Sequence, residues 1–424
     1  MRLRPACLAF LFSASAACSS GDFSVAEEVD SGGIDTGSDL DSGSNLDSGS
    51  TSDGSTDTGC APLGANPDTI YVDARASGGA IGSAACPVRS IREALSIVAS
   101  LPSAKRTVKV AGGTGGEPVV YNETSALVVK AQTSIVGDGP ERVTVTGGGP
   151  AGPAQAVFVL EGKTSLEGIT VIAGDKVGIA MMPAAFTVAT VRSTTVTKAK
   201  GTTNVAVLVT GAGAAELGPA FRAEKNQTAG VWVEDIFALH VIATGSVPNA
   251  FNENGAGIVV QKGTLNFDGG EVNKNVGVGI TLNATPKHNI TGLVARDNGG
   301  AGITIENGAG LKLRNSTLLT NRFGLVVKFG LVADLDLGAA DGGKNVFGGS
   351  LERNYRAAIC FQQAKNVKIP ATGNKFSSCP PLATVLTDGV SCDAPPSAYA
   401  DVLFYPFGTD PGPPLDTTGC TVGP

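Results

Sequence analysis

Basic and acidic side chains recur near the same point of successive sequence repeats in the second half of the chain. They are Lys274, Arg296, Asp297, Arg322 and Arg353, and Asp268 is nearby. Carboxylates there could hold a calcium ion while an arginine or lysine removes the acidic proton of a uronic acid, which is the chemistry of a calcium-dependent polysaccharide lyase. The same residues could instead form a non-catalytic strip that contacts a glycan, or the ordinary solvated edge of a repeat protein. We favour the solvated edge.

Other catalytic chemistries find little support in the sequence. His240 and His288 are the only histidines and neither lies in a recognisable motif, so we expect structural or surface roles for both. A nucleophile elbow and a P-loop are both missing. The absence of an Asp-Asp pair after residue 60 argues against an inverting glycosidase of the polygalacturonase kind. We expect no metal site and no cofactor, with calcium entering only under the lyase hypothesis.

Six cysteines lie in the second and larger part of the chain, clustered towards its two ends. They are Cys60, Cys86, Cys360, Cys379, Cys392 and Cys420. An even number of cysteines in an exported chain suggests disulfides, although six cysteines allow about fifteen pairings. We predict a bridge between Cys60 and Cys86 and two bridges among the other four. Their spacing does not match a zinc site.

A sequence repeat must position all these residues. Four asparagines, Asn252, Asn275, Asn298 and Asn321, recur every 23 residues, and each is followed by glycine and a short alternation of Val, Ile, Leu or Thr. A fixed period of this length indicates one supersecondary unit per repeat, stacked on its neighbours. The composition lacks the leucine lattice of leucine-rich repeats and shows no helical periodicity. It predicts an all-β fold, a right-handed parallel β-helix with coils of about 22–23 residues.

Strand alternation predicts which side chains fill the interior of this solenoid. Every second strand residue points inward, so apolar pairs from successive coils should stack into one column. These pairs are Ile280 with Leu282, Ile303 with Ile305, and Leu325 with Val327. The four recurrent asparagines could hydrogen-bond to one another along the axis as a structural ladder.

The segment from Thr69 to Val110 is expected to cap the solenoid. Ser90 and Glu93 form a capping-box pattern, and the apolar residues after them recur on one helical face. An amphipathic helix at this position would cover the open end of the apolar column. We place the capped β-helix at residues 60–375 and a Pro- and Cys-rich tail or cap at residues 376–424.

Several motifs in this segment resemble a known family. Ile70-Tyr71-Val72, the helix after Cys86-Pro87, Val110-Ala111-Gly112, Tyr121-Asn122-Glu123 and Val136-Gly137 occur in this order. The order resembles the start of pectin-lyase-like β-helix proteins, especially the DUF1565 type of bacterial surface protein. The resemblance covers residues 68–146 and extends through the Asn/Gly repeats to about residue 375. It implies the scaffold but no single activity, because such folds host lyases, hydrolases and non-enzymes.

The first residues indicate export. A basic start, a short apolar run and small residues before Cys18 describe a signal peptide at residues 1–17, too short to span a bilayer. Ser15-Ala16-Ala17-Cys18 resembles a bacterial lipobox, although Ser15 stands where an aliphatic residue is usual. The resemblance implies lipid attachment at Cys18 and a bacterial lipoprotein at the outer membrane, in the periplasm or on the cell surface.

Residues 18–59 form an acidic Ser/Gly/Asp segment. Ten acids and no lysine or arginine lie between residues 19 and 59, so this segment should be a disordered linker. It contains the acidic excess behind the net charge of −7, which leaves the rest of the chain nearly neutral. A neutral body without a basic stripe argues against nucleic acid as a partner. The oligomeric state is not indicated.

Three functional hypotheses follow. The first is a non-catalytic lipoprotein of the cell envelope that presents a β-helix surface to polysaccharide or to another cell surface. The second is a calcium-dependent lyase that acts on acidic glycans, and the third is a structural component of the envelope.

Overall fold

The computed structural model describes most of the chain after residue 59. The described residues are 60, 63–64, 67–77, 81–102, 104–147, 155–201, 204–244, 246–283, 287–328, 335–339, 341–348, 354–355, 357–362, 369–376, 383–386, 415–416 and 421–422. The chain divides into two units, Met1–Thr56 and Asp57–Pro424, and all described residues lie in the second. Cys18, Arg353, Cys379, Cys392 and Cys420 lie outside them.

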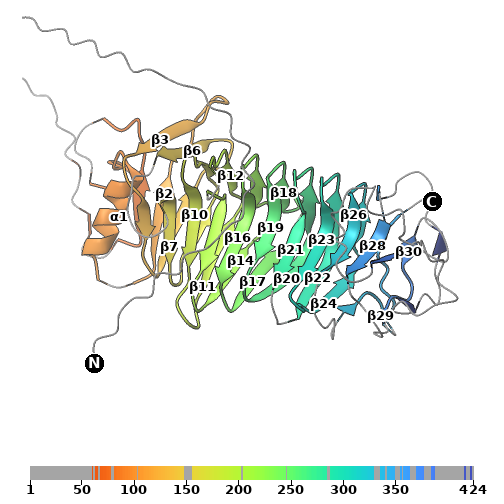
Figure 1. Ribbon diagram of the computed structural model, residues 1–424. Helices are drawn as coiled ribbons and strands as arrows, with labels where there is room; N and C mark the ends of the chain where they lie inside the picture. The colour runs from red at the N-terminus through yellow and green to blue at the C-terminus, as the bar shows by residue number, and fades with distance from the viewer. Residues whose placement is uncertain are drawn as a thin grey trace, which may run out of the picture. The chain divides into compact units, whose positions relative to one another are not determined.

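The second unit is a stack of parallel strands wound into coils, so the predicted parallel β-helix is confirmed (Figure 1). Each coil contributes to three columns of strands. The first column contains β1 (Thr69–Val72), β2 (Arg106–Val110), β5 (Thr133–Gly137), β8 (Ser165–Glu167), β11 (Val188–Arg192), β14 (Ala214–Leu217), β17 (Ala238–Ile242), the first halves of β20 (Thr264–Asn273) and β22 (His288–Arg296), β24 (Leu311–Arg314) and β27 (Leu335–Asp336).

The second column follows the first within each coil. It contains β3 (Val119–Glu123), β6 (Val143–Gly147), β9 (Thr170–Ile172), β12 (Thr195–Thr197), β15 (Arg222–Glu224), β18 (Ala250–Asn252), the second halves of β20 and β22, and β25 (Thr317–Leu319). Since β20 and β22 run through both columns, the two columns form one sheet.

The third column is a separate sheet, with 11 strands in the described part of the chain. Its strands are β4 (Leu127–Val129), β7 (Ala156–Glu161), β10 (Val177–Met182), β13 (Val207–Thr210), β16 (Ala229–Asp235), β19 (Ala256–Val260), β21 (Ile280–Asn283), β23 (Ala301–Glu306), β26 (Phe323–Val327), β28 (Ala357–Gln362) and β31 (Ala383–Leu386). Strand pairing continues past residue 375 through β31 and through β29 (Ile369–Pro370) with β32 (Leu415–Asp416) and β30 (Lys375–Phe376) with β33 (Thr421–Val422).

The inward residues of the three columns form one apolar core. The six side chains predicted to stack between coils are all buried: Ile280, Leu282, Ile303, Ile305, Leu325 and Val327. The 23-residue period holds where Asn266 pairs with Asn289 and Asn289 pairs with Lys312. Earlier coils have longer turns, so Ser134 pairs with Ser165, 31 residues further on (134 to 165).

A ladder of buried asparagines forms the corner between the second and third columns. The backbone N–H of Asn275 donates to Asn298 Oδ1 at 3.1 Å, and the N–H of Asn298 donates to Asn321 Oδ1 at 3.1 Å. The side-chain amides make a second bond at 2.8 Å in each pair. Each amide also donates to a backbone carbonyl of the preceding coil, as Asn298 does to Val272 at 2.9 Å. The side-chain amides and the backbone N–H groups of these asparagines are therefore paired with neighbouring coils.

The ladder extends beyond the predicted residues and omits one of them. Asn226, Asn254 and Asn354 belong to it, whereas Asn252 does not. Asn252 ends β18 and is half-buried, and its Oδ1 accepts from the N–H of Asn273. Asn254 takes the ladder position because this coil is two residues shorter than the 23-residue period. Asn254 and Asn275 are 21 positions apart in the sequence.

The recurrent glycines after the ladder allow close approach between coils. A Cβ on Gly279 would lie 2.5 Å from the carbonyl oxygen of Gly302 and 3.2 Å from Asn298 Nδ2. A Cβ on Gly302 would likewise lie 2.9 Å from the carbonyl oxygen of Gly324 in the next coil. Any side chain here would push apart the coils that the ladder joins.

A helix covers one end of the core, as predicted. Helix α1 (Ile91–Ser100) lies beside β1 and β2 at the end of the solenoid opposite β28 and β30 (Figure 1). Ser90 Oγ accepts from the N–H of Glu93 at 3.1 Å, and Ile91 and Ala94 are buried. Within the described residues, no helix is long and apolar enough to cross a membrane.

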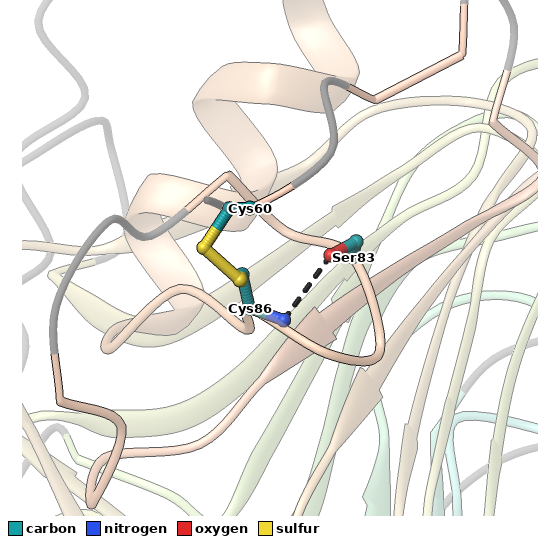
Figure 2. Close-up of a disulfide and its surroundings, with 3 residues drawn as sticks. All are labelled: Cys60, Ser83 and Cys86. Atoms are coloured by element: carbon teal, nitrogen blue, oxygen red, sulfur yellow. Dashed lines mark hydrogen bonds between the residues drawn. A yellow bond between two sulfur atoms is a disulfide. The ribbon is translucent and has the colours of Figure 1, made fainter. Parts of the chain in front are cut away.

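A disulfide joins Cys60 to Cys86 beside this helix (Figure 2). Their Cα atoms are 5.9 Å apart, and the N–H of Cys86 donates to Ser83 Oγ at 3.1 Å. The bridge fixes the first described residue to the cap. Cys360, in β28, is also disulfide-bonded.

Replacement of Asn298 with alanine tests the ladder. The variant leaves the backbone N–H of Asn275 without its acceptor in a buried corner. It also removes one hydrogen bond each from the side-chain amide of Asn275 and the carbonyl of Val272. We expect a loss of about 3 kcal/mol in the free energy of unfolding, measured by urea denaturation. Asn289→Ala, which removes an exposed asparagine, should cost less than about 0.5 kcal/mol. Equal losses for the two variants would show that the ladder is not a special constraint.

Candidate functional site

A row of polar side chains lies on the outer face of the first column. We call Glu216, His240, Asn266, Asn289 and Lys312 the polar row. The backbone register pairs each of them with the next across neighbouring strands, from β14 to β24. All five reach solvent. Neighbouring parallel strands are about 4.8 Å apart, so the row presents one hydrogen-bonding group at each such interval along the axis.

The hydrogen-bond and ion-pair partners of the five side chains differ along the polar row. Glu216 accepts from Arg192 at 2.6 Å, and Lys312 lies 4.0 Å from Asp341. In the middle, Asn289 Nδ2 donates to Asn266 Oδ1 at 3.0 Å, which leaves other amide atoms of both residues facing water. Within the described part of the chain, no side chain pairs with His240. The middle of the row therefore has spare donors and acceptors.

The outer face of the third column has the opposite character. Its outward residues in successive strands are mainly apolar and are buried or half-buried, and they form a second apolar cluster: Val159, Ala180, Leu208, Trp232 and Val259. Trp232 therefore belongs to a continuous apolar surface. The first column remains polar towards its start, where the aligned residues are Thr107, Ser134, Ser165 and Thr190.

The predicted charged strip is divided among several places. Lys274 and Asp297 are exposed and occupy the same turn position in successive coils, each immediately before a ladder asparagine and with φ of 56° and 57°. Arg296 ends β22 beside Asp297, and its N–H donates to Asn273 Oδ1 at 2.9 Å. These three residues share one corner of the solenoid.

The other members of the predicted strip lie elsewhere. Asp268 lies one column earlier, at the outer face of β20, beside the polar row and paired with Ile242 and Thr291. Arg322 follows the ladder, and its guanidinium carbon is 5.8 Å from the ring centroid of Phe323. Arg353 lies outside the described residues. The sequence predicts Asp268 only near that turn, and the structure places it in the first column.

The two histidines have different environments. His288 is fully buried at the start of β22, and its Nδ1 accepts from the N–H of Leu265 at 3.0 Å. His240 is on the polar row. The sequence contains a signal for this row, since Asn266, Asn289 and Lys312 recur every 23 residues. Only the strand register shows that they face outward together.

Two ionisable groups with shifted pKa values, Tyr121 and Asp341, lie towards opposite ends of the solenoid. Arg314 Nε and Nη2 donate to both carboxylate oxygens of Asp341 at 3.0 and 2.9 Å, and this hydrogen bonding holds the pKa of Asp341 below its usual value. Tyr121 is buried, and burial raises its pKa to about 12. Its hydroxyl donates to the carbonyl of Ala111 at 2.8 Å. Both arrangements anchor loops. The described residues contain no group of three or more His, Cys, Asp or Glu side chains that could hold a metal ion.

A comparison with models of protein families identifies the family of this chain. The model of the family DUF1565, described as a protein of unknown function, matches residues 76–383. The chain belongs to the DUF1565 family. A comparison of this DUF1565 protein with curated sequences finds no match. The resemblance inferred from the motifs near the cap is therefore confirmed at the level of the family.

Three solved structures are similar to this DUF1565 protein. The A-module of the Azotobacter vinelandii mannuronan C-5 epimerase AlgE4 has 14% identity and a TM-score of 0.39, covering 74% of this chain and 88% of the module. The AlgE6 A-module has 12% identity and a TM-score of 0.38, with coverages of 79% and 94%. Tailspike protein 3 of bacteriophage CBA120 has 12% identity and a TM-score of 0.29, with coverages of 71% and 58%. Likenesses of this size do not bear on activity.

Tyr121→Phe tests the buried hydroxyl near the cap. At pH 8 the variant should be less stable by about 1 kcal/mol, because it loses the bond to Ala111. The folded state holds the tyrosine proton up to a pKa of about 12, above the ordinary value of 10. The stabilisation is complete below pH 10 and is lost as the pH rises from 10 to 12. Urea denaturation should therefore show the difference between the two proteins narrowing over this range. A constant difference would contradict burial of the phenol.

Proposed function

We propose that this DUF1565 protein is a cell-envelope lipoprotein that binds polysaccharide without chemical turnover, and that the polar row is its contact surface. The observation that carries the proposal is the register of the row, which aligns a carboxylate, an imidazole, two amides and an ammonium group on one outer face.

The row suits a hydroxyl-rich polymer. Amides and imidazole can each donate and accept hydrogen bonds, as sugar hydroxyl groups require. The strands fix the spacing of these groups, so binding orders few side chains and has a small entropic cost. A repeating ligand could contact several coils at once, and many weak contacts would add. The apolar stretch of the third column, from Val159 to Val259, offers no comparable set of hydrogen-bonding groups.

Export and anchoring complete the proposal. A lipid on Cys18 would hold the chain at the membrane, and the acidic segment of residues 18–59 would act as a tether. The Cys60–Cys86 disulfide supports an oxidising compartment outside the cytosol.

A polysaccharide-binding assay tests the role of the polar row. The purified protein is titrated by calorimetry with neutral and uronic-acid polymers, including mannuronan, on which the epimerase neighbours act by name. The triple variant His240→Ala/Asn266→Ala/Asn289→Ala should bind at least about tenfold more weakly, since it removes several hydrogen bonds. A matched triple variant of the third column, Thr281→Ala/Asn283→Ala/Asn307→Ala, should bind normally.

Two outcomes would replace this proposal. A calcium-dependent rise in absorbance from unsaturated uronate, abolished by Lys274→Ala, Arg296→Ala or Arg322→Ala, would show a polysaccharide lyase. No binding to any polymer would leave a structural role in the envelope.

Cys18→Ser tests the lipid anchor. Cells fed a labelled fatty acid should label the natural protein, which should partition into detergent. The variant should take up no label and remain in the aqueous phase, because one thiol carries the attachment. Equal labelling of both proteins would reject Cys18 as the site.

A further inference from the structure

A cleft of about 530 Å³ lies between helix α1 and the first coils of the solenoid. It has the size of a small-molecule site and lies far along the solenoid from the polar row. Its polar lining includes Arg92, Arg106, Lys130, Ser96 and Thr133. The apolar part of the lining is Leu95, Val98, Ala99, Leu101, Pro102, Ala104, Val128 and Ala131.

The charge of this cleft is unbalanced. Three of its lining side chains are cationic, and no carboxylate lines it. Arg92 and Lys130 have partners outside the lining, since Arg92 lies 3.6 Å from Glu123 and Lys130 lies 2.6 Å from Glu161. The side chain of Lys130 is 65% exposed and can turn towards the cleft.

Arg106 differs from the other two cations because it is buried and poorly neutralised. The residue is 3% exposed, and its Nε has no hydrogen-bond partner. Its other nitrogens donate to the carbonyls of Pro102 and Lys105 at 3.3 and 3.4 Å, which are long bonds. Its one nearby carboxylate, Asp68, is 3.8 Å away on a side chain that is 94% exposed. A buried guanidinium with so few contacts is costly unless an anion approaches it.

We propose that this cleft binds a small organic carboxylate with an apolar body. Arg106 would receive the carboxylate, for which its planar donors are well suited, and Lys130 would add charge at the mouth. Leu95, Val98 and Val128 would cover the apolar body. This site is independent of polysaccharide binding by the polar row.

Calorimetry and thermal unfolding of the full chain with octanoate test the proposal. Octanoate should bind and raise the melting temperature in proportion to its occupancy. Octanamide, which has the same chain without the charge, should bind at least about tenfold more weakly, as should glucuronate, which has the charge on a polar body. Equal binding of octanoate and octanamide would overturn the carboxylate assignment. Tighter binding of glucuronate would overturn the apolar body.

Matched variants locate the site. Arg106→Met should keep the fold, because an apolar side chain of similar length replaces a poorly paired charge, and should weaken octanoate binding at least about tenfold. Lys109→Met removes an exposed cation from the same strand and should change nothing. Ser96→Asp places a negative charge on the exposed wall of the cleft and should also weaken binding, even if Arg106→Met fails to fold. Undiminished binding in Ser96→Asp and in a folded Arg106→Met would show that Arg106 is only a structural residue of the cap.

Discussion

The asparagine ladder is the constraint on which the rest of the solenoid depends. A corner between two strands leaves backbone groups that a buried position cannot leave unpaired. From Asn226 to Asn354 each corner is satisfied by the next coil, so these coils cannot slide or rotate independently. Because one rung fixes both the height and the angle of a coil, the outward side chains also fall into register. The surface is regular because the buried corner is regular.

The same constraint explains how one solenoid presents different surfaces. Inward positions of all three columns make one apolar core, whereas outward positions follow separate rules in each column. The first column carries amides, imidazole and charges, and the third carries Leu208, Trp232 and other apolar groups. The end of the solenoid adds a third environment, where helix α1 encloses a cleft around a buried arginine. The sides and the end thus present chemically different surfaces.

The sequence was sufficient for the scaffold because its signals are local and repeated. The 23-residue spacing of Asn275, Asn298 and Asn321 specifies stacked coils, and the Ser90–Glu93 pair specifies the start of the capping helix. The same spacing misled at Asn252, because one shorter coil moved the rung to Asn254 without changing the apparent period. The period of a sequence repeat gives the average length of a coil and does not reveal a change in the length of one turn.

The candidate site was harder to predict than the scaffold. Residues that lie close in the sequence, such as Asp268 and Lys274, are separated in the structure, since Asp268 lies in the first column and Lys274 in the turn after the second. Residues that share a face, such as His240 and Asn289, come from different coils. The sequence did not single out Arg106, because its importance comes from the hydrogen-bond partner that its Nε lacks in the structure.

Oxidative footprinting with and without bound polysaccharide tests whether the ligand lies on the polar row. Hydroxyl radicals modify exposed histidine, tryptophan and methionine, and the outer faces supply one reporter on the first column and two on the third. His240 lies in the polar row, whereas Trp232 and Met182 lie on the apolar face, and all three are half-buried. We predict that polysaccharide protects His240 and leaves Trp232 and Met182 unchanged. Protection of Trp232 and Met182 with no change at His240 would place the ligand on the third column and contradict this prediction.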